Sequence, residues 1–301
     1  MSSFRVIFRQ SCKGDNISCH LTYSRVLYVD GRMVVINKQA GVVAQFGHSK
    51  SQGEGHVKLL ELEQETNNPP VKSQVLYPVH RLDKGTTGCL ALARSRDMAR
   101  ELSRQFKQHT VEKTYYALVR GGESSFSAQQ GTIDNPVEVS TNGRASLGTL
   151  SGDKKSRTRW ELLGSSPSLP VSLLRLRLFT GHKHQLRVHM SKVLKTPILG
   201  DSIHSETKPK KEIRALLQSL SIPEDRLFLH SSHLGVIRYA KNGRQFRLGI
   251  QAPLPHDFVQ FCNHSGLELD SDIAKPIAFI DGEPSPGSEI HELNGHLSEL
   301  H

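Results

Sequence analysis

The densest cluster of reactive residue types in this chain of 301 residues is the segment HRLDKGTTGCLALARS, residues 80–95. Asp83 stands between Arg81 and Lys84, directly before a turn rich in glycine and threonine. Nearby cations favour the charged form of a carboxyl group, so we expect Asp83 to be ionised at neutral pH. An ionised carboxylate is a nucleophile or base and a poor general acid, which argues against a glycoside hydrolase unless a second carboxyl group with a raised pKa is present. A surface salt bridge beside a turn is the alternative interpretation.

A second cluster, TGHKHQLRVHM at residues 180–190, places imidazoles and cations where a helix is expected to begin after a strand. His184 and Arg187 are three residues apart and would share a helical face, where they could hold a phosphate or a carboxylate. His182, His184 and His189 lack the spacing of zinc ligands and have no acid or thiol nearby, so we expect no metal site. A polar helix start with capped histidines is the alternative.

Two further segments carry residues of interest. In VEKTYYALVRGG, residues 111–122, a strand would place Tyr115 and Tyr116 on opposite faces, one in the core and one free to stack on an extruded base. In RLFLHSSHLGV, residues 226–236, Arg226 precedes an apolar run. A buried strand with a flanking charge explains that segment equally well.

The charge of the chain is unevenly distributed. The net charge is +10, but residues 266–301 carry net −7, which leaves net +17 on residues 1–265. Such a basic body is expected to attract a polyanion, most commonly nucleic acid, although a basic surface without a partner is the alternative. No apolar run approaches the roughly 20 residues that span a bilayer, so no membrane association is expected.

The cysteines and the N-terminal residues bear on the compartment. The four cysteines show neither C-x-x-C pairs nor metal-ligand spacing, which indicates a reducing compartment. Residues 1–14 contain three basic residues and no acid, and a helix there would be amphipathic, as in a mitochondrial transit peptide. We therefore expect a mitochondrial protein, with a cytoplasmic or nuclear location as the alternative.

The elements that must position these residues are predicted from periodicity and turn signals. Asp30 and Gly31 predict a hairpin over residues 25–41, and residues 114–119, 158–163 and 171–179 read as strands. Helices are predicted at 57–65, 97–109, 184–194 and 212–220, and a late hairpin at 234–250. We expect an α+β fold: a single catalytic domain, residues 20–265, on a mixed, largely antiparallel sheet with flanking helices. It follows a basic segment, residues 1–19, and precedes an acidic, disordered tail, residues 266–301.

Taken together, the segments resemble the RluA-type pseudouridine synthases. HRLDKGTTGCLALARS is similar to their H-R-L-D-x-x-T-S-G-L-L-L-L-A-K signature, and five other motifs occur in the family's order: VVINKQAG, EKTYYALVRG, TGHKHQLRVH, ILGDSIH and RLFLHSSHL. The sequence departs from the pattern at four positions: Gln39 replaces proline, Thr87 serine, His182 arginine and His204 tyrosine. We therefore expect substrate contacts near His182 and His204 to differ from those typical of the family.

The resemblance implies the pseudouridine synthase fold and the isomerisation of uridine to pseudouridine in RNA, without a metal or a cofactor. It implies Asp83 as the catalytic carboxylate, Arg187 as the partner that keeps it ionised, and Tyr115 as the ring that stacks on the flipped uracil. It also implies substrate-binding residues: Arg81, His184, Leu186 as the side chain that closes the pocket, and Arg226 for phosphates.

The expected partner is RNA, bound by a monomer without a small-molecule cofactor. If the N-terminal residues direct the chain to mitochondria, large-subunit rRNA of that organelle is the favoured target, with tRNA as the alternative. A non-catalytic RNA-binding protein that keeps the fold is a second alternative, although Asp83 is present. An N-glycosylase would also use a carboxylate and a flipped base, but it would release free base.

Overall fold

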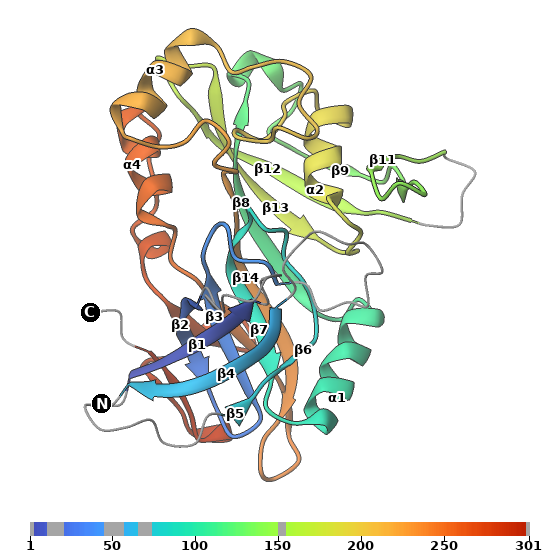
Figure 1. The fold of residues 1–301 in the computed structure, drawn as a ribbon, viewed down its shortest axis with the longest axis vertical. Helices are drawn as coiled ribbons and strands as arrows, with labels where there is room; N and C mark the ends of the chain where they lie inside the picture. The colour runs from blue at the N-terminus through green and yellow to red at the C-terminus, as the bar shows by residue number, and fades with distance from the viewer. Residues whose placement is uncertain (1–2, 11–20, 45–56, 66–73, 150–154, 299–301) are drawn as a thin grey trace, which may run out of the picture. The chain divides into compact units, whose positions relative to one another are not determined.

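The computed structural model describes residues 3–10, 21–44, 57–65, 74–149 and 155–298 (Figure 1). The chain forms two compact units. Unit 1 consists of Met1–Val111, His233–Pro253 and Lys275–His301, and unit 2 of Glu112–Ser232 and Leu254–Ala274. Residues 20–265, predicted as a single catalytic domain, span both units, and the chain returns to unit 1 twice. Composition could not reveal this, because the returning strands are separated in sequence from the strands they pair with.

Unit 1 is built on antiparallel strand pairs. The strands β4 (Val57–Glu65), β1 (Ser3–Gln10), β2 (Leu21–Val29), β3 (Met33–Lys38) and β7 (Thr87–Ala93) follow one another in the sheet. The predicted hairpin is confirmed, since β2 and β3 pair around Asp30, whose carboxylate accepts hydrogen bonds from the backbone N–H groups of Arg32 and Met33. The remaining strands of this unit are β5 (Gln74–Val75), β6 (Tyr77–Pro78), β15 (Gln245–Gln251), β16 (Ile277–Ile280), β17 (Glu283–Pro284), β18 (Glu289–Ile290) and β19 (Gly295–Leu297).

Two helix predictions in unit 1 are wrong. The segment expected to be a helix at 57–65 is strand β4, and residues 3–10 of the supposed amphipathic helix are strand β1. In β4, leucine and glutamate alternate from Leu60 to Glu63, a period of two that suits a strand. β1 pairs with both β2 and β4, so each edge of β1 has a hydrogen-bonding neighbour. Residues 11–20 lie outside the described residues.

The acidic tail is also not disordered where the structure describes it. β16 pairs with β15, and β19 pairs with β2. Ala278 and Ile290 are buried in the core of unit 1. Apolar residues of the tail thus lie in the core, and the charge and proline around them concealed this.

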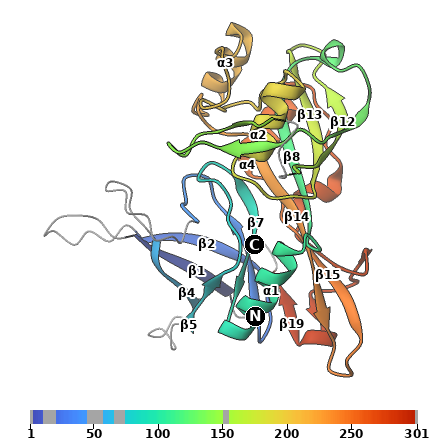
Figure 2. The ribbon, with the colours of Figure 1, turned by 90° about the vertical axis from the view of Figure 1, so that its right-hand side faces the viewer.

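Helix α1 (Arg96–Lys107) packs beside β7 in unit 1 (Figure 2). Its N-cap is Ser95, whose hydroxyl accepts a hydrogen bond from the N–H of Met98. Met98 and Leu102 are buried in the core together with Leu234 and Ile250 from the late hairpin of β14 (Leu229–Tyr239) and β15. The division between the units falls within β14.

Unit 2 holds a sheet in which β9 (Gln130–Ile133), β12 (Thr158–Ser165), β13 (Val171–Leu178) and β8 (Glu112–Arg120) pair antiparallel in that order. β10 (Val137–Val139) and β11 (Ala145–Leu147) form a separate hairpin. The predicted helix at 184–194 is α2 (Gln185–Val188) continued by a π-helical turn, His189–Val193. Short 3-10 turns lie at Glu123–Ser125, Ser271–Ala274 and, in unit 1, His291–Leu293.

The core of unit 2 lies between its sheet and two helices. α3 (Lys211–Ser219) lies next to α4 (His256–His264), as Figure 1 shows. Leu173 and Leu118 from the sheet pack with Phe258 and Phe261 of α4. Helix α4 was not predicted from the sequence. No helix of the described residues is long and apolar enough to cross a membrane.

Candidate active site

Asp83 lies in unit 1 at the first position of a tight turn that leads into β7. Its backbone carbonyl accepts a hydrogen bond from the N–H of Thr86 at 3.0 Å, which closes the turn over Lys84 and Gly85. Asp83 is half-buried, whereas Arg81 is exposed and Leu82 is buried. The turn thus holds a carboxylate near the surface of unit 1 on a backbone that is anchored on both sides.

The anchor after Asp83 comes from the segment VVINKQAG. Lys38 is fully buried, and its ammonium donates hydrogen bonds to the carbonyls of Gln39 and Val42 at 2.9 Å and of Lys84 at 3.1 Å. The Lys84 carbonyl also accepts a hydrogen bond from the N–H of Gly41 at 2.9 Å. Gly41 has a φ of +84°, which favours glycine. The first motif of the chain therefore fixes the backbone of the second.

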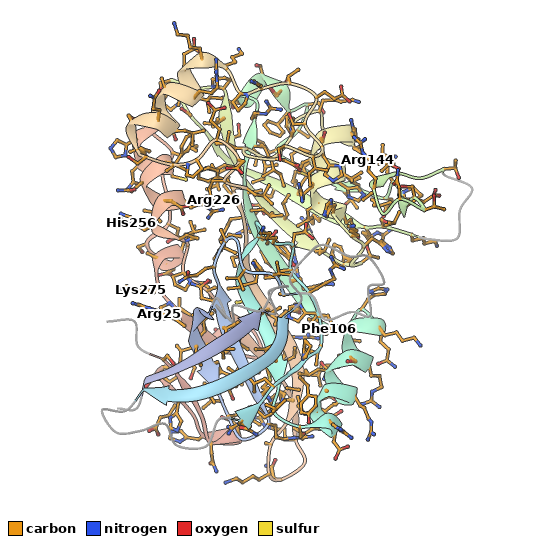
Figure 3. All side chains as sticks on the ribbon, viewed as in Figure 1. Arg25, Phe106, Arg144, Arg226, His256 and Lys275 are labelled. Atoms are coloured by element: carbon orange, nitrogen blue, oxygen red, sulfur yellow. The ribbon has the colours of Figure 1, made fainter. Side chains whose placement is uncertain are left out.

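The anchor before Asp83 is the imidazole of His80. Its Nε2 accepts a hydrogen bond from the backbone N–H of Ala91 on β7 at 2.8 Å. The ring also stacks on Phe106 of α1, with ring centroids 4.4 Å apart; Phe106 is labelled in Figure 3. β6 ends at Pro78, so His80 supplies an acceptor to β7 just beyond the end of the β6–β7 pairing. His80 thus holds the chain before Asp83, and Lys38 holds the chain after it.

In unit 2, strand β8 presents Tyr115 and Tyr116 to opposite faces of the sheet, as predicted. Tyr115 lies opposite Leu176 of β13 and is buried, with 6% of its surface exposed. Tyr116 lies on the other face, where burial raises the pKa of its hydroxyl despite the opposing effect of the neighbouring Arg175. Arg175 is held by Glu161 across β12 and β13 at 2.6 Å. The Tyr116 face is therefore occupied by a salt bridge, and Tyr115 is the tyrosine whose role stays a prediction.

Arg187 is placed by α2 and forms a buried, two-pronged ion pair with Asp201. The distances are 2.9 Å from Nε to Oδ2 and 2.6 Å from Nη2 to Oδ1. Burial raises the pKa of the Asp201 carboxyl, and the hydrogen bonds and charge of Arg187 outweigh this and hold the pKa below its usual value. Gly200 has a φ of +81°, and a Cβ there would come within 1.8 Å of the Arg226 carbonyl oxygen, so only glycine fits before Asp201.

Two histidines adjoin this ion pair. His184 Nδ1 lies 2.8 Å from His204 Nε2, and His184 Nε2 lies 3.4 Å from Nη1 of Arg187. Burial, aided by the charge of Arg187, lowers the pKa of His204 to about 4, against the opposing effect of Asp201. His204 is therefore neutral at neutral pH, and its backbone N–H donates to Asp201 Oδ1. The residue that departs from the family's tyrosine thus contributes to the support of Arg187.

Leu186 and Arg226 are the other residues predicted for the site in unit 2, and both are buried. Leu186 is buried on α2. Arg226 is mostly buried and pairs with Asp257 in the first turn of α4, with 2.6 Å between Nε and Oδ2. Figure 3 labels Arg226 and, at the start of α4, His256. The phosphate-binding role of Arg226 stays a prediction, but its guanidinium already has a carboxylate partner.

Four residues of these sites were not singled out from the sequence: Lys38, His80, Asp201 and Lys113. Each stands inside a motif quoted above, so position in a motif was the available signal, but only the structure shows their burial and contacts. Lys113 is 8% exposed, and burial lowers its pKa to about 8. His189, by contrast, is held at both ring nitrogens, by Thr158 Oγ1 and the Asn135 carbonyl, as expected of a structural histidine. Within the described residues, no group of three His, Cys, Asp or Glu side chains is arranged to hold a metal ion.

Comparison with known proteins gives the family. Residues 32–192 match the profile described as RNA pseudouridylate synthase. The chain is 33% identical over 223 residues to tRNA pseudouridine synthase C of Yersinia pestis, across 69% of this chain and 79% of that protein. It is 32% identical over 209 residues to ribosomal large subunit pseudouridine synthase D of Nitrosomonas europaea, across 69% of this chain and 57% of that protein.

Two mammalian proteins are similar along most of the chain. Pseudouridylate synthase RPUSD4, mitochondrial, of Mus musculus is 30% identical over 270 residues, which cover 81% of this chain and 70% of that protein. The solved structure of Human RNA Pseudouridylate Synthase Domain Containing 4 aligns with a TM-score of 0.58 at 27% identity, covering 82% of this chain and 94% of the solved one. The motifs, the α+β fold and these similarities agree: the chain belongs to the RluA-type family of RNA pseudouridine synthases, which are isomerases.

Proposed function

We propose that this chain converts uridine to pseudouridine in structured RNA, with Asp83 as the catalytic carboxylate. The strongest support is that hydrogen bonds hold the backbone on both sides of Asp83, in a chain that belongs to this family. Lys38 and Gly41 hold the backbone after Asp83, and His80 holds the backbone before it. Catalytic groups need such fixed positions, because small displacements cost large factors in rate.

The reaction breaks the bond between C1′ of the ribose and N1 of uracil and joins C1′ to C5. In this proposal the Asp83 carboxylate attacks C1′ or removes a sugar proton, and both routes need it ionised. Tyr115 stacks on the uracil, Leu186 closes the pocket, and Arg187 keeps the carboxylate ionised. Arg81, His184 and Arg226 contact the RNA. No water is added and no redox change occurs.

The decisive variant is Asp83→Asn, which is nearly isosteric but cannot act as an anionic nucleophile or base. The purified variant is expected to form no pseudouridine and to bind the same RNA within a few-fold of wild type. Asp97→Asn is the matched control, because it makes the same substitution at an exposed carboxylate in the first turn of α1 and should leave pseudouridine formation unchanged. Pseudouridine formation by Asp83→Asn would reject the mechanism, and its absence from the wild-type reaction would reject the function.

For the RNA target we propose rRNA, with mitochondrial large-subunit rRNA favoured. The support is the similarity to a ribosomal large-subunit enzyme and to a relative whose name places it in mitochondria. Residues 3–10 form a strand, so an amphipathic N-terminal helix no longer adds to this argument.

A tRNA target is the second candidate, because tRNA pseudouridine synthase C of Yersinia pestis is similar at 33% identity. The two candidates are separated by mapping pseudouridine across total RNA. Three kinds of cells are compared: cells with the wild-type chain, cells with Asp83→Asn and cells without the protein. Imaging of the tagged chain tests the location. Loss of a modification only from tRNA, or a signal only in the cytosol or nucleus, would contradict the favoured target.

A further inference from the structure

Lys113 on β8 is mostly buried, and no neighbouring group among the described residues neutralises its positive charge. The residue is 8% exposed. In the part of the chain that the structure describes, no hydrogen bond or ion pair involves its side chain. Arg187 and Arg226, also buried in unit 2, each have a carboxylate at 2.6 Å. Because burial of an unpaired charge costs free energy, this lysine is poorly explained as a stabilising residue of the fold.

The strand geometry places Lys113 beside the proposed uracil site. Lys113 and Tyr115 are two residues apart on β8 and therefore project to the same face, about 7 Å apart along the strand. The Lys113 ammonium lies next to Gly181, where an added Cβ atom would be 3.8 Å from Nζ. Gly181 begins the segment that continues into α2 with Leu186 and Arg187. The ammonium thus lies between the strand of Tyr115 and the segment that leads to Arg187.

We propose that the Lys113 ammonium stabilises the negative charge on uracil after the C1′–N1 bond has broken and before the C1′–C5 bond forms. This inference rests on the proposed function. When the C1′–N1 bond breaks, its electron pair stays on uracil, which becomes an anion with charge shared between N1 and the carbonyl oxygens. C5 then bonds to C1′, the C5 proton leaves, and N1 takes up a proton. Lys113 stays protonated throughout, and the atoms and charges of the isomerisation balance without it.

An ammonium suits this task because the uracil ring must rotate after the C1′–N1 bond breaks and before the C1′–C5 bond forms. It is a compact charge with three donors on a flexible chain, so it can follow the carbonyl oxygens as the ring rotates. A guanidinium, which prefers planar two-pronged contacts, would favour one orientation of the ring. Uridine is neutral before cleavage, so a cation without a partner binds the anionic species more strongly than the substrate and lowers the barrier between them.

The test compares wild type with Lys113→Met and Lys113→Arg on an RNA that the wild type modifies. Single-turnover rates of pseudouridine formation, the Kd for RNA and the unfolding temperature are measured for each. Lys113→Met is expected to lower the rate by about 100-fold or more, the size seen when one donor to a developing anion is removed. Its Kd should stay within about threefold, and its unfolding temperature should equal or exceed that of wild type, because the unpaired charge is gone.

Lys113→Arg keeps the charge, and its rate should be at least tenfold higher than that of Lys113→Met. Lys211→Met, which removes an exposed charge at the start of α3, is the matched control and should leave the rate within about twofold.

Three results would overturn the assignment. The first is a rate for Lys113→Met within threefold of wild type. The second is a Kd more than tenfold weaker with a normal rate at saturating RNA, which would assign Lys113 to a phosphate of the backbone. The third is a lower unfolding temperature for Lys113→Met together with no recovery by Lys113→Arg, which would assign it to the fold. Failure of the proposed function itself appears separately, as an inactive wild type, and the inference falls with it.

Discussion

The ammonium of Lys38 donates a hydrogen bond to the carbonyl oxygen of Lys84, 3.1 Å away, and so fixes the peptide between Lys84 and Gly85 in the turn that begins at Asp83. Two motifs more than forty residues apart in sequence meet through this contact. Lys38 is fully buried and donates to three backbone carbonyls, those of Gln39, Val42 and Lys84. The candidate catalytic turn therefore depends on a lysine that itself has no surface exposed to substrate.

Lys38→Met tests this dependence. Methionine fills a similar volume but donates nothing, so three backbone carbonyls lose a donor, at roughly 1–3 kcal/mol for a buried one. We expect both the free energy of unfolding and the rate of pseudouridine formation to fall, with the change in rate persisting at temperatures where the variant is fully folded. Urea unfolding and single-turnover assays measure the two effects. A folded variant with a wild-type rate would show that the contact does not position Asp83.

Arg187 and Asp201 form a pair whose partners can be removed singly or together. Arg187→Met leaves the Asp201 carboxylate buried without its cationic partner, which costs about 3–5 kcal/mol. The double variant Arg187→Met with Asp201→Asn should recover much of that stability, because no buried charge is left unpaired. It should not recover activity if Arg187 also acts on the catalytic carboxylate. Recovery of both would confine Arg187 to holding Asp201.

Tyr115 offers a ring and a hydroxyl whose roles can be separated. Tyr115→Phe keeps the ring and should retain most of the activity, whereas Tyr115→Ala removes the stacking surface, worth roughly 1–3 kcal/mol per base. A difference of about tenfold or more in rate between the two variants is expected from single-turnover assays. Equal losses would mean that the hydroxyl carries the function.

The C-terminal residues are expected to stabilise unit 1. Ile290 is 1% exposed and packs in the core of this unit. Ile290→Ala should lower the free energy of unfolding by about 2–4 kcal/mol. Ile203→Ala is the matched control, because Ile203 is 48% exposed and the same truncation should cost well under 1 kcal/mol. Similar values for the two variants in urea unfolding would mean that the tail does not contribute to the core.

Lys113 also predicts how stability changes with pH. Burial lowers its pKa in the folded state from 10.5 to about 8. At pH values between these two pKa values, Lys113 is more protonated in the unfolded chain than in the folded one. Proton binding there favours the unfolded state, so raising the pH weakens this effect and the free energy of unfolding rises. Relative to Lys113→Met, the wild type should therefore gain stability from pH 8 to pH 10.5, by at most about 3 kcal/mol. Urea unfolding of both proteins across this range measures the difference, and a constant difference would contradict the lowered pKa.

Local signals predicted the parts of the fold that depend on neighbouring residues. Asp30 and Gly31 predicted a turn because their backbone preferences are local, and Met98 and Leu102 lie in a helix whose period was visible. Strand β4 was missed because its leucines satisfy both a helical and a strand pattern until β1 pairs with it. That pairing joins residues about fifty positions apart, which no local period records.

The sequence singled out the reactive residues of the candidate site, whose roles stay predictions, and not the residues that support them. Asp83, Arg187 and Tyr115 were selected because carboxylate, guanidinium and aromatic groups have evident chemistry. Lys38 and Asp201 stood in the same motifs but were passed over, because a lysine or aspartate is usually exposed and the sequence does not show burial. The contact between His204 and His184 joins two elements of unit 2 and could not be inferred from either.

The return of the chain to unit 1 has a consequence for synthesis on the ribosome. Leu234, Ile250 and Ile290 belong to the same core as Leu27 and Met33, yet they are translated after most of unit 2. The strands synthesised first therefore keep part of their apolar surface exposed until residues beyond 233 leave the exit tunnel. The last part is covered only when the residues near 290 emerge. During that interval the nascent N-terminal segment is a natural client for chaperones that shield unpaired strands.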